Sequence, residues 1–352
     1  MRGIPDFRLN KQDARREMER LAKAGIRFEF NAKLDPADLD DMLKHYDRIV
    51  VATGLQIPKI LPLEGWRSES ILYAVNMMEK VNSGKEVRMH GNVVVIGRGS
   101  VAMDTARAAL RLGAEKVTVM CLECGDDIPA HKWEIKEAQE EGIEVISGVS
   151  PTRFQGASYR LDGVEYVQIR SLDPKTCRFD KVEGTEKMMP ADFVIIATGQ
   201  RSDKDWKERK NVVLAGDIAG GKCSVIDAMA SGRAAALQID NELMGRTYEE
   251  YKVERRVNPG ERKYKVYPAT RLKLKFEGVR ELGAEERKKT FDIVELGLDG
   301  DEARLEVQRC LSCGYRYIET EQCIGCGVCQ KVCPKGDVIS MIAVPENARK
   351  GK

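Results

Sequence analysis

The sequence predicts an α/β fold, in which a parallel sheet is covered by helices. Two observations support this prediction. Apolar runs such as NVVVIG (residues 92–97) and FVIIATG (193–199) have the length of buried strands. Between residues 92 and 148, runs of this kind alternate with helical segments in the order strand, helix, strand, helix, strand. This alternation is typical of parallel strands that are joined by covering helices.

The other elements follow in order along the chain. Residues 11–24 are expected to form a helix, and IRFEF (26–30) a short strand. A buried strand at 47–54 then runs into a glycine turn. Short polar strands at 151–190 favour an antiparallel hairpin region, and residues 211–240 contain a strand, the turn AGDIAGG and a helix.

The composition narrows the class of protein. A chain of 352 residues is long enough for two or three domains. Its 58 Lys and Arg residues nearly balance 56 Asp and Glu residues, which argues against nucleic acid as the main partner. No apolar run approaches the roughly 20 residues of a membrane span, and the charged N-terminal helix has no apolar signal-peptide core. We therefore expect a cytoplasmic protein without a membrane span.

Six of the ten cysteines crowd into residues 310–333. In a reducing compartment, such clustering indicates a metal site rather than disulfides. Four of these thiols, in the run CIGCGVCQKVCP, have the spacing of a [4Fe–4S] loop that is closed by a proline, and structural zinc is the alternative. These four are Cys323, Cys326, Cys329 and Cys333.

Cys310 and Cys313 form a further Cys-x-x-Cys pair and bring the candidate ligands to six. Six thiolates do not complete two four-cysteine clusters, so we expect one cluster. Which thiolate is its fourth ligand stays open, because the last cysteine of such a run ligates the other cluster in two-cluster ferredoxins. A second cluster would need ligands from outside the chain or donors other than cysteine.

A dinucleotide-binding loop follows the strand at 92–97. Gly97, Gly99 and Ala102 form a GxGxxA pattern between this strand and a helix. Gly97 permits a tight turn, Gly99 lets a pyrophosphate approach the backbone, and Ala102 allows close packing of helix on strand. Free amides at the helix N-terminus would then bind the phosphates.

An acidic residue follows the second strand of this unit. Glu123, in KVTVMCLE, stands near the position that binds the adenine ribose hydroxyls, which favours NAD over NADP. Cys121 and Cys124 frame it as another Cys-x-x-Cys pair. Since no further candidate ligands are nearby in the sequence, we interpret both as ordinary small side chains.

Taken together, several motifs resemble the small subunit of glutamate synthase and its relatives, the FAD-dependent NAD(P)H:ferredoxin-type oxidoreductases. The motifs are GIPDFRLN, the strands VVATG and IIATG, VIGRGSVAMDTARAALRLGAEKVTV, AGD followed by SVIDAMASGRAAA, and FDIVELGLDGDEARLEVQRCLSC. The resemblance covers residues 1 to about 313. It implies a glutathione-reductase-like pair of dinucleotide-binding domains, one for FAD and an inserted one for the nicotinamide.

The resemblance also assigns roles to individual residues. It implies that Gly54 and Gly199 lie at the crossover turns between the two domains, and that Asp217, beside Gly216 in AGD, hydrogen-bonds the ribityl chain of FAD. A helix beginning near Ser224 and Val225 would point its N-terminus at the flavin. The residues implied to line the nicotinamide dinucleotide are Gly97, Gly99, Ser100 and Val101.

The chain departs from the family pattern in three ways. The Gly-rich FAD loop that precedes GIPDFRLN in the family is missing, so the FAD domain is expected to be incomplete. Either a separate polypeptide supplies its N-terminal half, or the sequence is a truncated reading frame. Family members that use NADPH carry an arginine pair where this chain has CLECG, which favours NADH. The cluster cysteines lie in a C-terminal ferredoxin-like α+β module, whereas the family has them near the N-terminus.

These inferences define five expected regions. They are a partial FAD-binding domain (1–68), an NAD(P)-binding insert (69–190), the return of the FAD-binding domain (191–250), a basic linker (251–305) and a 4Fe–4S module (306–352).

The expected function is electron transfer from NAD(P)H through FAD and a 4Fe–4S cluster to a partner subunit or ferredoxin. We expect no catalytic acid or base, because the flavin and the nicotinamide carry the chemistry. Two alternatives remain. One is a ferredoxin-dependent NAD(P)+ reductase that runs in reverse, and the other is a flavin-free, nucleotide-binding iron–sulfur scaffold in a larger redox complex.

Overall fold

The structure is a computed structural model, and it describes residues 3–64, 69–157, 160–173, 176, 178–221, 223–245 and 279–309. The chain divides into two units, Met1–Tyr251 with Gly278–Gly297, and Lys252–Glu277 with Leu298–Lys352. The α-helices are α1 (Lys11–Lys23), α2 (Leu39–Met42), α3 (Ala74–Asn82), α4 (Ser100–Arg111), α5 (Lys132–Glu140), α6 (Val225–Leu243), α7 (Ala284–Arg287) and α8 (Gly300–Arg309). The 3-10 helices are η1 (Pro36–Asp38), η2 (Gly125–Asp127) and η3 (Gly216–Ala219). All of these except α8 belong to the first unit.

The strands of the described residues form several sheets and belong to the first unit. The strands are β1 (Ile49–Val51), β2 (Ile57–Pro58), β3 (Ile71–Tyr73), β4 (Asn92–Gly97), β5 (Lys116–Met120), β6 (Glu144–Ile146), β7 (Val149–Ala157), β8 (Arg160–Leu172), β9 (Phe179–Lys181), β10 (Lys187–Pro190), β11 (Phe193–Ala197), β12 (Gln200–Arg201), β13 (Val212–Leu214), β14 (Arg280–Glu281) and β15 (Glu295–Gly297).

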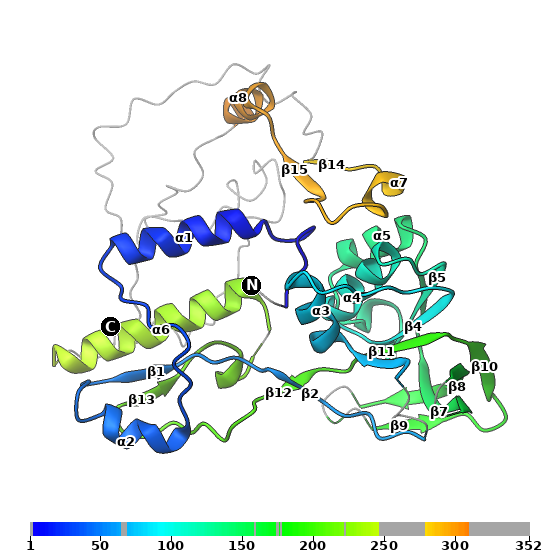
Figure 1. Cartoon of the computed structure of the whole chain (residues 1–352), viewed down its shortest axis with the longest axis horizontal. Coiled ribbons are helices and arrows are strands. Elements are labelled where there is room, and N and C mark those ends of the chain that lie inside the picture. Colours follow the sequence, from blue (N-terminus) through cyan, green and yellow to red (C-terminus); the bar gives the residue numbers. More distant parts are fainter. Residues whose placement is uncertain are drawn as a thin grey trace, which may run out of the picture. The chain divides into compact units, whose positions relative to one another are not determined.

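The central sheet contains five parallel strands in the order β3–β11–β4–β5–β6 (Figure 1). Its middle strands, β4 and β11, are the two apolar runs from which the sequence predicts buried strands. They pair in register from Phe193 with Val93 to Ala197 with Gly97. Parallel strands that are buried on both faces carry near-continuous apolar residues, which explains the strength of this signal. The α/β prediction is therefore confirmed.

The two faces of this sheet enter different cores. Val93 and Val95 of β4 pack in one core with small side chains of α4, such as Ala106. Val94 and Ile96 pack in the other core, together with side chains from β7 and β8. Successive side chains of a strand point to opposite faces, so helices cover one face and antiparallel strands cover the other. These antiparallel strands, β7 to β10, form the hairpin region that the sequence predicts.

A smaller group of elements surrounds the two-stranded parallel sheet β1–β13. Its core contains Leu39, Ile49, Val51, Trp206 and Val212. The chain leaves this group through β2 and returns through β12, and these two short strands pair with each other in antiparallel register. The sequence region expected to hold the FAD-binding parts thus forms a small core of its own.

Two segments differ from the sequence predictions. The run IRFEF has no strand partner within the described ranges, and Ile26 and Phe30 are exposed. The described part of the predicted basic linker (251–305) contains β14, α7 and β15, and Val294 is buried in the helix-side core. The Val294 N–H also donates to Phe7 O at 3.1 Å. The burial of Val294 and this hydrogen bond therefore hold in place a segment whose composition indicates an exposed linker.

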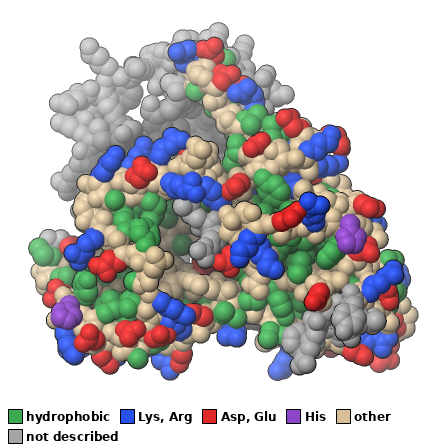
Figure 2. All heavy atoms as spheres, in the orientation of Figure 1, with side chains coloured by type: hydrophobic (Ala, Val, Ile, Leu, Met, Phe, Trp, Pro, Cys, Tyr) green, Lys and Arg blue, Asp and Glu red, His purple; other side chains and the backbone are tan. Residues whose placement is uncertain are grey.

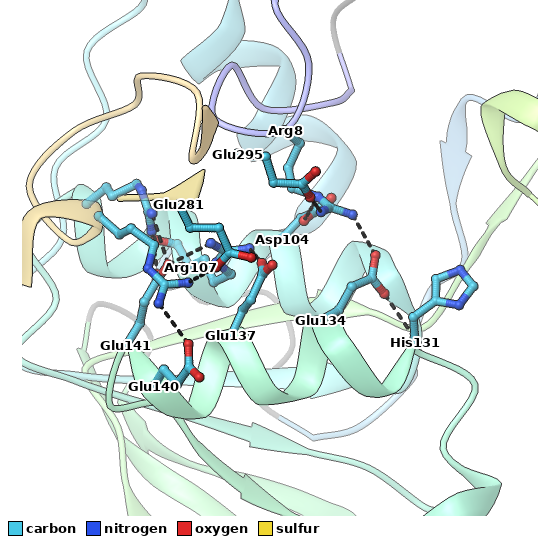
Figure 3. A network of polar contacts seen from close by, with 12 residues as sticks. Arg8, Asp104, Arg107, His131, Glu134, Glu137, Glu140, Glu141, Glu281 and Glu295 are labelled. Atoms are coloured by element: carbon cyan, nitrogen blue, oxygen red, sulfur yellow. Dashed lines mark hydrogen bonds and ion pairs between the residues drawn. The ribbon is translucent and has the colours of Figure 1, made fainter. Parts of the chain in front are cut away.

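A buried ionic network joins α4 to α5 (Figure 3). The guanidinium of Arg107, which is 1% exposed, donates from Nη1 to Glu137 Oε2 at 2.5 Å and from Nη2 to Glu141 Oε1 at 2.7 Å. Arg111 Nη1 donates to Glu141 Oε2 at 2.6 Å. The ring of Phe7 lies against both guanidinium groups, with its centroid 5.1 Å from Arg107 Cζ and 4.3 Å from Arg111 Cζ. Each of these buried charges has a partner of opposite sign.

The protonation of these carboxyls follows from their partners. Burial opposes the ionisation of Glu141, but hydrogen bonds from Arg111 and Arg107 outweigh it and hold the pKa of Glu141 below its usual value. Burial dominates at Glu137 and raises its pKa, although Arg107 opposes this effect. Glu141, which accepts from two arginines, is therefore the better stabilised anion.

A second ionic cluster fastens the N-terminal segment to the same two helices (Figure 3). Arg8 Nε lies 3.1 Å from Asp104 Oδ1, and Arg8 Nη2 donates to Glu134 Oε1 at 2.7 Å. The other oxygen of Glu134 accepts from the His131 N–H at 3.0 Å, which caps the first turn of α5. Burial raises the pKa of Asp104 to about 6, although Arg8 opposes this shift. The segment GIPDFRLN thus packs on α4 and α5, two helices that cover the central sheet.

Within the described ranges, no helix combines the length and hydrophobicity that a bilayer span requires. Figure 2 shows acidic and basic side chains spread over the same face of the molecule, with hydrophobic side chains between them. This distribution agrees with the near balance of charge in the sequence.

Replacing Arg107 with methionine should destabilise the fold strongly. The change removes the partner of Glu137 and one of the two arginine partners of Glu141, and leaving a buried charge uncompensated costs about 3–5 kcal/mol. Urea denaturation of the wild type and of Arg107→Met measures the difference in the free energy of unfolding.

Arg16→Met is the matched control, because Arg16 pairs with Asp13 on the surface of α1, where both side chains are well exposed. Its effect should stay within about 0.5 kcal/mol. A loss of less than about 1 kcal/mol in Arg107→Met would contradict the importance of the buried pairs.

Candidate functional site

The candidate dinucleotide loop lies where β4 meets α4. A Cβ atom on Gly97 would come within 2.7 Å of Ala197 O and 2.9 Å of Ala102 Cβ, so only glycine fits at this place. A Cβ on Gly99 would meet no atom within 4 Å. Packing inside the protein therefore requires glycine at position 97, whereas Gly99 faces open space beside the loop.

The N-terminus of α4 has hydrogen-bonding capacity for an anion. Gly99 is the N-cap residue and carries no side chain that could cap the helix, whose first residue is Ser100. Val101, in the first turn, is exposed. Free amides in this turn and the helix dipole together suit the pyrophosphate of a dinucleotide.

Glu123 lies beside this loop, just after β5, and is only 3% exposed. Its Oε1 accepts a hydrogen bond from Nη1 of Arg98, the residue between the two glycines. Its Oε2 is buried and has no hydrogen-bond partner. An unsatisfied buried carboxylate oxygen is costly, and a ribose hydroxyl is a donor of the right chemistry to satisfy it.

The backbone around this carboxylate is held in place on both sides. Glu123 O accepts from the Gly148 N–H at 3.1 Å, and Arg98 O accepts from the Ala130 N–H at 3.1 Å.

Cys121 is buried, and burial raises the pKa of its thiol to about 12, so the thiol stays protonated. Cys121 and Cys124 are both free thiols. Among the described residues, no group of three or more His, Cys, Asp or Glu side chains could hold a metal ion.

The two crossover glycines precede the paired strands β2 and β12. Gly54 has a φ of +68° and Gly199 a φ of +107°, a region that favours glycine. The Lys59 N–H donates to Gly199 O at 3.0 Å, so the outgoing segment is bonded to the returning one. Because β11 ends at Ala197, beside Gly97, the return crossover begins next to the dinucleotide loop.

The AGD turn and the start of α6 form the candidate flavin side of the site. Gly216 has a φ of +72°, and its N–H donates to Ser231 Oγ at 2.9 Å. Asp217 follows it in η3. Ser224 caps α6 by accepting from the Asp227 N–H at 3.1 Å, and Val225 after it is exposed.

The cluster cysteines lie outside the described residues, and so does Cys177. This applies to Cys310, Cys313, Cys323, Cys326, Cys329 and Cys333. The structure therefore brings together the dinucleotide loop and Glu123, and it places Gly199 near that loop. The contact between Arg98 and Glu123 is not predicted from the sequence. A sequence pattern could have indicated this contact. In it, an arginine stands between two glycines of a phosphate-binding loop and an acidic residue follows the next strand.

Two family models match the chain. One, described as "Pyridine nucleotide-disulphide oxidoreductase", matches residues 37–222. The other, described as "4Fe-4S binding domain", matches residues 314–335 and thus contains the CIGCGVCQKVCP run but neither Cys310 nor Cys313.

Curated relatives agree with these matches. The NADP(+)-dependent formate dehydrogenase subunit beta of Moorella thermoacetica is 29% identical over 345 residues, which cover 88% of this chain and 48% of that protein. The glutamate synthase [NADPH] small chain of Escherichia coli K12 is 30% identical over 283 residues, which cover 68% of this chain and 60% of that protein. The chain spans about half the length of these relatives. The resemblance to the glutamate synthase small subunit is confirmed.

Solved structures show the same fold. FprA of Mycobacterium tuberculosis, in complex with NADPH, superposes with a TM-score of 0.57 at 15% sequence identity, over 69% of this chain and 75% of that chain.

These matches give the chain its cofactors, FAD and NAD(P)H for the oxidoreductase segment and a 4Fe–4S cluster for the C-terminal segment. The residues present fit the nicotinamide dinucleotide and the cluster. Open space at Gly99 and the unsatisfied Glu123 Oε2 suit a dinucleotide, and four thiolates at cluster spacing suit iron.

The variant Gly99→Ala should fold normally and bind NADH at least about tenfold more weakly, a loss of roughly 1.4 kcal/mol. Its φ of −104° suits any L-residue and its Cβ meets no protein atom, but the added methyl narrows the space for a pyrophosphate. Fluorescence titration with NADH measures the affinity.

Gly97→Ala is the contrasting variant, since its Cβ would press on Ala197 O. It should lower the free energy of unfolding by about 1–3 kcal/mol. Unchanged NADH affinity in a well-folded Gly99→Ala would mean that the dinucleotide binds elsewhere.

Proposed function

Because the chain belongs to the pyridine nucleotide-disulphide oxidoreductase family, we propose that it carries electrons from NAD(P)H through FAD and a 4Fe–4S cluster to a partner protein. Bound flavin supplies the conversion between the two-electron chemistry of the nicotinamide and the one-electron chemistry of the cluster. The chain's own residues bind and orient these groups.

The dinucleotide site is the observation that supports this proposal best. The loop at Gly97 and Gly99 offers an open helix N-terminus, and the buried Glu123 lacks a donor for one oxygen. Amides of the first turn of α4 would bind the pyrophosphate, and Glu123 would accept from the adenine ribose. An acceptor for ribose hydroxyls favours NADH as the electron donor.

The flavin would lie on the other side of the return crossover. The N-terminus of α6 carries a partial positive charge, which would stabilise negative charge on a reduced flavin bound next to this helix end. Asp217, which shares its turn with Gly216, would accept from the ribityl hydroxyls, as the family resemblance implies. The exposed side chains of Val225 and Ile226 offer apolar surface at the same helix end.

In this proposal, polypeptide outside the described residues covers the small sheet β1–β13 and completes the FAD-binding domain. The sheet β1–β13 has two strands within the described residues, and Val50 is 43% exposed although Ile49 and Val51 beside it are buried. Ile226 and Met229 on α6 are 79% and 71% exposed. Further strands and a helix with a Gly-rich loop would cover apolar surface of this kind. The names "subunit beta" and "small chain" of two relatives are consistent with work in a multi-subunit enzyme.

Anaerobic visible spectroscopy tests this function. The protein is reconstituted with iron and sulfide, mixed with FAD and with any polypeptides that accompany it, and titrated with NADH. We expect a broad cluster absorption before NADH, and bleaching of both flavin and cluster after it. Cys326→Ser should lose the cluster absorption and keep flavin bleaching, whereas Cys223→Ser should behave as the wild type.

Two results would contradict the proposal. Tight binding of zinc without any iron would make the cysteine run a structural zinc site. Binding of NADH without bleaching of the flavin would leave the flavin-free scaffold as the better account.

A further inference from the structure

Two aromatic side chains stand at the start of α5, next to the candidate dinucleotide loop. Trp133 is 42% exposed, and His131, the N-cap residue, is also exposed. The two rings lie nearly parallel, at 11° to each other, and their centroids are 5.9 Å apart. Tryptophan is highly buried on average in folded proteins, so an exposed stacked pair beside a candidate ligand site is a candidate contact surface.

The order of the strands puts this pair on one side of the loop. The parallel strands β11, β4 and β5 lie side by side, so their carboxyl ends follow one another along one edge of the sheet. The return crossover begins after β11, the glycine loop follows β4, and Glu123 follows β5. Helix α5 joins β5 to the parallel strand β6, so its N-terminus lies at this same edge. A dinucleotide whose nicotinamide points to the crossover therefore has its adenine on the side of α5.

The backbone ties the start of α5 to the loop. The N–H of Ala130, which is buried, donates to the backbone carbonyl of Arg98 at 3.1 Å. Arg98 stands between the two glycines of the loop, and His131 directly follows Ala130. A ligand that lies along the loop and reaches Glu123 therefore passes close to His131.

Charged side chains hold the aromatic pair in place. Arg8 Cζ lies 4.3 Å from the centroid of the Trp133 ring. Arg8 is itself bound by Asp104 at 3.1 Å and by Glu134 at 2.7 Å. Glu134 also accepts from the His131 N–H at 3.0 Å, and the His131 ring points away from this network (Figure 3). Rings that are fixed in this way lose little conformational entropy when a flat ligand stacks on them.

We propose that His131 and Trp133 form the surface that binds the adenine ring of the dinucleotide. The purine stacks on the exposed side of the pair, while its ribose reaches Glu123 and the pyrophosphate reaches the N-terminus of α4. Stacking on an aromatic side chain contributes affinity without reading the 2′ position, so this surface serves NADH and NADPH alike. The inference rests on the proposed dinucleotide site at Gly97 and Gly99, and it adds the residues that hold the far end of the ligand.

Binding titrations of the full chain with NADH and with ADP-ribose test the inference without any turnover. ADP-ribose keeps the adenine and the pyrophosphate but lacks the nicotinamide, and its affinity is measured by displacement of fluorescent NADH. In His131→Asn, which keeps a side chain suited to a helix N-cap, both dissociation constants should rise by the same factor, about fivefold or more. Trp133→Ala should also raise both, whereas Trp133→Phe keeps an aromatic ring and should retain most of the affinity.

His45→Asn is the matched control, since His45 is an exposed histidine that follows α2 in the smaller group of elements. It should leave both dissociation constants unchanged, and thermal unfolding of each variant shows that the fold is retained. Values within about twofold of the wild type in both His131→Asn and Trp133→Ala would overturn the inference and leave the proposed function intact. A loss of NADH affinity without an equal loss for ADP-ribose would also overturn it, because the pair would then contact the nicotinamide half. If the wild type binds neither ligand, the inference and the proposed function fail together.

Discussion

The close contact between the ends of β4 and β11 is the constraint on which the site depends. Gly97 pairs with Ala197 at the C-terminal edge of the parallel sheet, and no Cβ fits between them. This contact brings the dinucleotide loop next to the strand that continues, through Gly199 and β12, into the smaller group of elements around β1–β13. A nicotinamide bound at the loop and a flavin bound by that group would therefore meet at the crossover. In open α/β sheets, ligands bind at this edge, beyond the carboxyl ends of the strands.

The helices behind the sheet are held by charge as well as by apolar packing. Arg107 is buried between α4 and α5 with two carboxylates, and Arg8 joins the N-terminal segment to both helices. Replacing such pairs by apolar residues is often neutral or stabilising, so their presence is weak evidence for greater stability. Their geometry has another consequence. The segment that leads from the N-terminus and the segment 279–297 both pack on α4, so the dinucleotide-binding domain gathers parts of the chain that are far apart in sequence.

Much of the fold was predictable from the sequence because its strongest signals are local. Residues 93–96 (VVVI) and 193–197 (FVIIA) are uninterrupted apolar runs, which are typical of parallel strands that are buried on both faces. The GxGxxA pattern is likewise local, because its three small residues lie within one short segment between a strand and a helix. By contrast, IRFEF has the composition of a strand but gains no partner in the described part of the chain, and strand composition alone cannot supply one. The burial of Arg107 depends on Glu137 and Glu141, which are 30 and 34 residues away, and no local pattern reports such a pair. The contact of Arg98 was not predicted for the same reason, because its partner Glu123 lies 25 residues later in the sequence.

The central claim is that electrons from a nicotinamide at the Gly97 loop reach the cluster. Electron paramagnetic resonance of the protein, isolated anaerobically with the polypeptides that accompany it and supplied with FAD, tests this claim most directly. The account predicts that NADH, supplied at a concentration near its Kd for the wild type, produces the signal of a reduced cluster in the wild type. It predicts much less of this signal in Gly99→Ala at the same concentration, and the full signal in both proteins with dithionite. A cluster that dithionite reduces but NADH leaves oxidised in the wild type would contradict the account, and so would an equal response of Gly99→Ala to NADH.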